Sequence, residues 1–128
     1  MPDLGERVNV MGPQPVAVRS PVPPEMLVAA DRVLELLAAG DAGALAAIAT
    51  AAGAGELAAL AKTIRPGAYN RHEIVATARV NYHHYVKARL FGDRAEPATV
   101  QFRLGQRDGR WIVWEAMDLS GGRTAWTR

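Results

Sequence analysis

The sequence contains no cysteine among its 128 residues. This absence excludes disulfide bonds, thiolate metal sites and cysteine nucleophiles. Aromatic residues make up only 6%, and no run approaches the roughly 20 apolar residues that are needed to span a bilayer. The opening stretch MPDLGERVNVMGPQPVAVRS also lacks the basic start and apolar run of a secretory signal. We therefore expect a soluble, cytoplasmic protein with no membrane partner.

The sequence also lacks a dense block of one charge. Its net charge is only +2, and its arginines are scattered from Arg7 to Arg128, so nucleic-acid binding is not indicated. Hydrophobic residues make up 49%, which is typical of a folded chain that buries one core. We expect an extended or disordered N-terminal arm over residues 1–24, a folded domain over 25–119 and a C-terminal tail over 120–128. VAVRS, within the arm, could add an edge strand.

The first half of the domain has helical spacing. Residues 25–39 are predicted to be a helix, with Pro24 at its first position and Gly40 at its C-terminal cap. One apolar stripe recurs at steps of three and four: Met26, Leu27, Ala30, Val33, Leu34 and Leu37. Asp41 can cap a second helix, which AAGAG then interrupts, and ELAALAKTI predicts a third helix that ends at Arg65-Pro66-Gly67.

From residue 73 the apolar period changes to two, which predicts strand. One side holds Ile74, Ala76, Ala78, Val80, Tyr82, His84, Val86, Ala88 and Leu90. A straight strand of this length would span about 60 Å, so we expect the segment to bend or break near Asn81. An alternative stays open, because Asn70 and Glu73 resemble a capping box and residues 71–81 could be helical.

The segments ATVQFRLGQ and RWIVWEAMDL predict a hairpin around Asp108-Gly109, a pair typical of a type I′ turn. Counting back from that turn pairs Gln106 with Trp111, Leu104 with Val113, Phe102 with Glu115 and Val100 with Met117. One face is then apolar, with Glu115 embedded among Ala98, Val100, Phe102, Leu104, Trp111, Val113, Met117 and Leu119.

Helices before an antiparallel sheet, closed by GDRAEPATVQFRLGQRDGRWIVWEAMDL, resemble the nuclear transport factor 2-like superfamily. The resemblance covers about residues 25–119. It implies an α+β fold in which N-terminal helices pack on a curved antiparallel sheet, forming a cone with an apolar pocket. Members include isomerases, cyclases, dehydratases and epoxide hydrolases, and many others bind only ligands or partners, so the fold does not assign a function.

Two adjacent histidines raise the question of a metal site. On a strand, His83 and His84 point to opposite faces, and His72 is the only other histidine, so no metal-ligand spacing is present. We expect neither a metal nor a cofactor. His84 and Glu115 are instead the candidate acid–base pair, with Tyr82 as a donor. The residues predicted to line a ligand pocket around them are Phe102, Leu104, Trp111, Val113 and Met117. A structural role for both polar residues is the favoured interpretation.

The opposite sheet face is more apolar than a solvated face requires, with Val75, Tyr85, Ile112, Trp114 and Ala116 on it. This favours a homodimer through the sheet face, unless the arm or the C-terminal Trp126 covers Trp114. Three functions therefore stay open. The leading one is a cone that binds a small apolar ligand, the second is a cofactor-independent isomerase, cyclase or dehydratase, and the third is a protein–protein interaction module.

Overall fold

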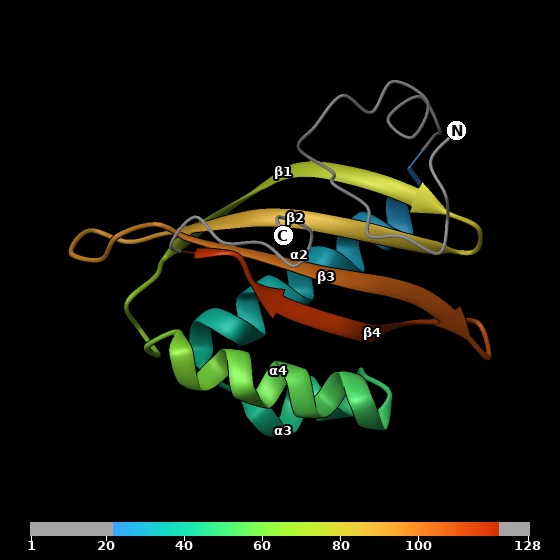
Figure 1. The fold of residues 1–128 in the computed structure, drawn as a ribbon, viewed down its shortest axis with the longest axis horizontal. Helices are drawn as coiled ribbons and strands as arrows, with labels where there is room; N and C mark the ends of the chain where they lie inside the picture. The colour runs from blue at the N-terminus through green and yellow to red at the C-terminus, as the bar shows by residue number, and fades with distance from the viewer. Residues whose placement is uncertain (1–21, 121–128) are drawn as a thin grey trace, which may run out of the picture.

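The computed structural model describes residues 22–120 as three helices followed by four antiparallel strands (Figure 1). The helices are α2 (Pro24–Ala39), α3 (Ala42–Ala47) and α4 (Ala51–Thr63). The strands are β1 (Arg71–Val80), β2 (His83–Phe91), β3 (Ala98–Arg107) and β4 (Arg110–Asp118). They form one sheet in the order β1-β2-β3-β4. The α+β prediction is confirmed, and the helical alternative for residues 71–81 is wrong.

The helix ends follow the predicted capping chemistry. Gly40 has a φ of 71° and its N–H donates to carbonyls in the last turn of α2, and Asp41 accepts a hydrogen bond from the Ala44 N–H at 3.1 Å. The predicted interruption at AAGAG is wrong, since α4 begins there. Thr50 caps it by accepting from the Gly53 N–H at 3.0 Å.

Gly53 lies within α4 because the helix approaches β4 closely at this point. A Cβ added to Gly53 would lie 2.4 Å from the Val113 carbonyl oxygen, which no side chain could tolerate without movement. Val113 is itself tied to the start of α4, because its carbonyl accepts from the Thr50 N–H and its N–H donates to the Ile48 carbonyl, both at 2.9 Å. The glycine permits contact between helix and strand where the sequence had indicated a helix break.

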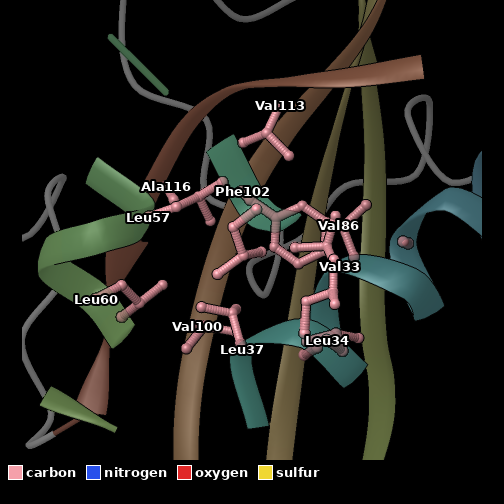
Figure 2. Close-up of a cluster of buried hydrophobic side chains, with 14 of the residues drawn as sticks. Val33, Leu34, Leu37, Leu57, Leu60, Val86, Val100, Phe102, Val113 and Ala116 are labelled. Carbon is pink, nitrogen blue, oxygen red and sulfur yellow. The ribbon is translucent and has the colours of Figure 1, made fainter. Parts of the chain in front are cut away.

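The core lies between the helices and the inner face of the sheet, the face toward which α2 and α4 pack (Figure 2). Phe102 is 1% exposed and is surrounded by helix residues such as Leu34, Leu37 and Leu57 and by strand residues such as Val86 and Val100. Burial of this many aliphatic side chains around one aromatic ring is the main stabilising term of the fold.

Two β-bulges change which residues face the core. In the β3–β4 hairpin, Asp108 and Gly109 have φ of 54° and 77°, as the predicted type I′ turn requires, and Gln106–Trp111 and Leu104–Val113 pair as predicted. The register then shifts by one residue between Arg103 and Leu104. Phe102 therefore pairs with Ala116 and Val100 with Asp118, so the predicted partners Glu115 and Met117 are wrong. Both of these residues lie on the outer face, and Ala116 faces the core.

The β1–β2 hairpin confirms the predicted break at Asn81, which has a φ of 57° in the turn between the strands. A second register shift, between Ile74 and Ala76, places Ala76, Ala78 and Val80 opposite Lys87, Tyr85 and His83 on the outer face. The predicted common side for these alanines and His84 is therefore wrong. The same shift turns Arg79 to the side of His84, its direct partner in the sheet.

The domain boundaries stay a prediction. Most of the predicted arm, including VAVRS, and most of the tail, including Trp126, fall outside the described residues. No helix within residues 22–120 is long and apolar enough to cross a membrane.

Candidate functional site

A cleft lies where the two hairpin turns approach the first residues of α2, and we name it the hairpin-end cleft. Its volume is about 580 Å³. Its lining comes from the start of α2 and from the turn ends of the β1–β2 and β3–β4 hairpins. The lining residues are Pro23, Glu25, Arg79, Asn81, Tyr82, His84, Gln106, Gly109 and Trp111. Three of the nine, Tyr82, His84 and Trp111, are residues that the sequence predicted as site residues.

His84 is the most buried polar residue of this cleft, with 7% of its surface exposed. Its ring meets the Trp111 ring edge to face, with 5.4 Å between ring centroids. Within residues 22–120, neither ring nitrogen has a hydrogen-bond partner. The ring nitrogens are not among the fully buried unpaired atoms, so they are open to the cleft, where water or a ligand can pair with them.

Electrostatics keep the imidazole of His84 neutral. Burial lowers its pKa below the ordinary value of 6.5, and repulsion by the charge of Arg79, and by His83 when that ring is protonated, lowers it further. A neutral imidazole offers one N–H donor and one acceptor nitrogen. His84 is therefore suited to hydrogen bonding at neutral pH.

Arg79 provides the cation of the cleft. It lies directly opposite His84 in the β1–β2 pair, and its Nε donates to the Asn81 carbonyl at 3.1 Å. That bond orients the guanidinium group and occupies only one of its five N–H donors. The sequence pattern placed Arg79 on the solvated side, because an alternating pattern cannot reveal the extra residue at Val75.

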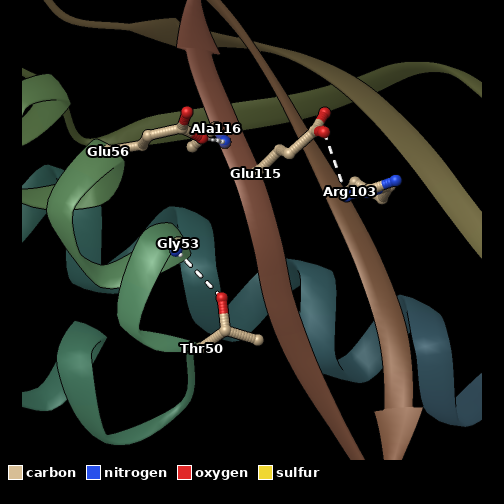
Figure 3. A network of polar contacts seen from close by, with 6 residues as sticks. All are labelled: Thr50, Gly53, Glu56, Arg103, Glu115 and Ala116. Carbon is tan, nitrogen blue, oxygen red and sulfur yellow. Dashed lines mark hydrogen bonds and ion pairs between the residues drawn. The ribbon is translucent and has the colours of Figure 1, made fainter.

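Glu115 does not share a face with His84. Its carboxylate accepts from Arg103 on the outer face at 2.9 Å, as Figure 3 shows. Arg103 is its direct partner in the β3–β4 ladder, so the ion pair is a cross-strand contact. The geometry that suggested a His84–Glu115 acid–base pair is therefore wrong.

The remaining predicted residues are dispersed. Tyr82 is 89% exposed in the turn, at the rim of the hairpin-end cleft, and Trp111 is half-buried in its wall. Phe102, Leu104 and Val113 are at most 1% exposed and belong to the core, and none of the three lines this cleft. Met117 lies on the outer face, opposite Gln101. A ligand-binding role for these residues stays a prediction. Phe102, around which the ligand pocket was predicted, is itself buried in the core.

A larger cleft, of about 1070 Å³, lies between α2 and the start of β1. Three of its polar side chains are already engaged. His72 contacts Asp31 at 2.9 Å, Arg71 lies over the Phe91 ring, and the Tyr69 hydroxyl donates to the Glu96 carbonyl. Paired groups give a ligand less to gain, so the smaller hairpin-end cleft is the better candidate.

The outer face carries a cluster of aromatic and charged side chains. The rings of His83 and Trp114 are 5.0 Å apart, and the Arg107 guanidinium lies over Trp114 at 5.1 Å. Three buried polar atoms on this face have no hydrogen-bond partner: Gln101 Oε1, Arg103 Nε and Trp114 Nε1. The face is therefore neither a conventional solvated surface nor part of the core.

Metal-binding chemistry finds no support in the described part of the chain. Among residues 22–120, no group of three or more His, Cys, Asp or Glu side chains is placed to hold a metal ion. The residues of the hairpin-end cleft supply one imidazole and one carboxylate, His84 and Glu25, which is too few for a protein metal site of the usual kind.

Comparison with known proteins identifies the fold. A solved structure, "Putative NTF2-like transpeptidase" from Campylobacter jejuni, superposes with a TM-score of 0.57 and covers 70% of this chain and 96% of its own. The chain has a nuclear transport factor 2-like fold. The identity of 12% supports the fold alone. No family model matches the sequence, and no curated protein matches it. The nuclear transport factor 2-like fold suits ligand binding or catalysis and specifies neither.

Proposed function

We propose that this protein is a small-molecule-binding domain and that the hairpin-end cleft is its site. The observation that carries the proposal is His84, which is nearly buried while its ring nitrogens have no partner within residues 22–120. Trp111 adds an apolar wall, and Arg79 and Gln106 add polar groups around it. An apolar surface with a few convergent polar groups is the usual composition of a ligand site.

Binding is favoured over catalysis because the predicted acid–base pair is divided between the two faces of the sheet. His84 remains in the cleft, and Glu115 is held by Arg103 on the outer face. Tyr82 stands at the rim, where solvent surrounds its hydroxyl. A single neutral histidine can orient a ligand, and proton transfer would require a second group beside it.

A fragment screen by NMR tests this function. Backbone and ring signals of Arg79, His84 and Trp111 should shift together when a fragment binds, because they line one cleft. His72 and Tyr69, in the larger cleft beside α2, serve as the internal reference. Fragments that shift the reference pair and leave His84 unchanged would contradict the assignment.

A second proposal, homodimerisation through the outer sheet face, is favoured by the residues on that face. Tyr85, Trp114 and Met117 lie there and are only half-buried within one chain. Such an aromatic and aliphatic surface resembles the centre of a protein interface. A second copy of this chain would cover it by the simplest symmetric arrangement.

Sedimentation of Trp114→Glu tests the dimer. The substitution should shift a dimer toward monomer, because it places a charge at the centre of the proposed interface. Val28→Glu is the matched control, since Val28 is 69% exposed on α2. A wild-type protein that sediments as a monomer throughout the micromolar range would rule out this assembly.

A further inference from the structure

We infer that the ligand of the hairpin-end cleft carries a carboxylate, or a group of the same charge and shape, that Arg79 and His84 bind together. This inference rests on the proposed ligand-binding function and specifies the chemical class of the ligand. It depends on four features of the cleft: an oriented cation, an unpaired imidazole, the start of a helix and one opposing charge.

The oriented cation is Arg79. Its position opposite His84 in an antiparallel pair places the two Cα atoms about 5 Å apart. Both side chains line the same cleft. With Nε held by the Asn81 carbonyl, the guanidinium group is fixed at one edge and retains its terminal N–H groups. A planar fork of this kind matches the two oxygens of a carboxylate better than any neutral group.

The unpaired imidazole provides the second donor. His84 is over nine-tenths buried, and no side chain or carbonyl within residues 22–120 accepts from its ring. The pKa of His84 is lowered, so the ring is neutral and Arg79 provides the positive charge of the pair. An anion held between the two would accept from both groups, and the low exposure of the His84 side chain would shield these hydrogen bonds from water.

The first turn of α2 adds a weaker attraction. Pro23 occupies the N-cap position, and no side-chain cap is present. Because Pro24 has no N–H, the first amide of the helix is that of Glu25, and it lies at the positive end of a 16-residue helix. Pro23 and Glu25 both line the cleft. The helix start therefore favours a negative group, although it would not form a site alone.

Glu25 places a negative charge in the same cleft and therefore restricts which anions can bind there. The titratable and charged groups that line the cleft around His84 are Arg79 from β1, Glu25 from α2 and Tyr82 from the turn, and the neighbouring His83 acts on it from the opposite face. The Glu25 carboxylate would repel an anion, so it limits the site to a ligand with one negative group placed toward β1. The rest of the ligand, which meets the Trp111 ring, would be apolar or aromatic.

The test compares benzoate with benzamide, which has nearly the same shape and no charge. Each compound is titrated into the full-length protein at neutral pH, and the ring signals of His84 and Trp111 are followed by NMR. Benzoate should bind more tightly than benzamide. Arg79→Gln should weaken benzoate binding about tenfold, because one charge-assisted contact is lost. Glu25→Gln should instead strengthen benzoate binding by about twofold to threefold, and benzamide binding should change little in either variant.

Arg110→Gln is the matched control, since Arg110 is exposed at the start of β4 and does not line the cleft. It changes the net charge as Arg79→Gln does and should leave benzoate binding unchanged. Equal binding of benzoate and benzamide at His84 would overturn the carboxylate inference and leave the proposed function standing. If neither compound at millimolar concentration shifts His84 or Trp111, the carboxylate inference and the assignment of this cleft as the ligand site both fail.

Discussion

The two faces of the sheet differ in how they satisfy their side chains. On the inner face, Phe102, Leu104 and Val113 are at most 1% exposed and pack within the apolar core cluster. On the outer face, Arg103 and Trp114 each have a buried nitrogen without a hydrogen-bond partner. The inner face is therefore complete within one chain. The outer face retains polar atoms that solvent does not reach and that no group within residues 22–120 pairs with, which is rare in a folded protein.

Truncating one aromatic side chain on each face should give the largest difference in stability between the two faces. Phe102→Ala should lower the free energy of unfolding by about 3–5 kcal/mol, because it leaves a cavity among side chains that cannot collapse into it. Tyr85→Ala, on the outer face, should cost about 1 kcal/mol. Urea denaturation of both variants measures the difference, and similar losses would show that the outer face is packed as tightly as the core.

A pair of glycines in α4 tests how tightly the helix approaches the inner face. Gly53→Ala should destabilise by about 1–3 kcal/mol, since the new methyl would meet the Val113 carbonyl oxygen. Gly55→Ala should stabilise by up to about 1 kcal/mol, because nothing lies within 4 Å of its added Cβ and alanine favours helix. Thermal melting of the two variants gives the comparison. A stabilised Gly53→Ala would mean that α4 lies farther from β4 than described.

The Arg103–Glu115 ion pair on the outer face should contribute less to the free energy of unfolding than the packing of Phe102 or the close approach of Gly53 to Val113. Glu115→Gln removes the charge that Arg103 contacts at 2.9 Å, while its shape is nearly unchanged. Both side chains are partly exposed, so solvent screens the pair and the expected cost is below about 1 kcal/mol. Chemical denaturation at low and high salt measures it. A loss of several kcal/mol would indicate that a partner or another segment buries the pair.

The pH dependence of stability should differ slightly between the faces. His84, on the inner side, and His83, on the outer side, both have a pKa lowered from 6.5, chiefly by burial. The folded state binds these protons more weakly than the unfolded chain, so stability is complete above pH 6.5 and declines as the pH falls through the folded-state pKa.

Substitution separates the contributions of the two histidines. His84→Gln should flatten the decline below pH 6.5 more than His83→Gln does, because His84 is the more buried. Denaturation midpoints across a pH series measure this. The assignment is contradicted if the slope is the same in His84→Gln as in the wild type.

The sequence was a sufficient guide wherever a local rule applied. The Asp108-Gly109 turn fixed the register as far as the Leu104–Val113 pair, and the caps at Gly40 and Asp41 marked the helix ends. The register failed beyond Leu104. A bulge inserts one extra residue into a strand, and every residue beyond it then points to the other face. The apolar–polar alternation of the sequence does not show where the extra residue lies.

The candidate site was predicted only in part for the same reason. His84 and Trp111 share a cleft because each lies close to its turn, where the register is not yet displaced. Glu115 and Arg79 are each separated by a bulge from the residues that set the predicted register. The bulge in the β3–β4 pair moves Glu115 out of the predicted site, and the bulge in the β1–β2 pair brings Arg79 into the cleft. Glu25 and Gln106 join through tertiary packing, which no periodicity encodes.

The contacts of β4 with α4 also determine how the sheet could grow. Thr50 and Ile48 bind both backbone groups of Val113, and the Glu56 carboxylate accepts from the Ala116 N–H at 2.8 Å. Within residues 22–120, strand addition is therefore confined to β1, where a bulge and the charges of Arg71 and Glu73 oppose it. If two copies joined along β1, their sheet would have β4 at both ends, and a third copy would find no open edge to extend.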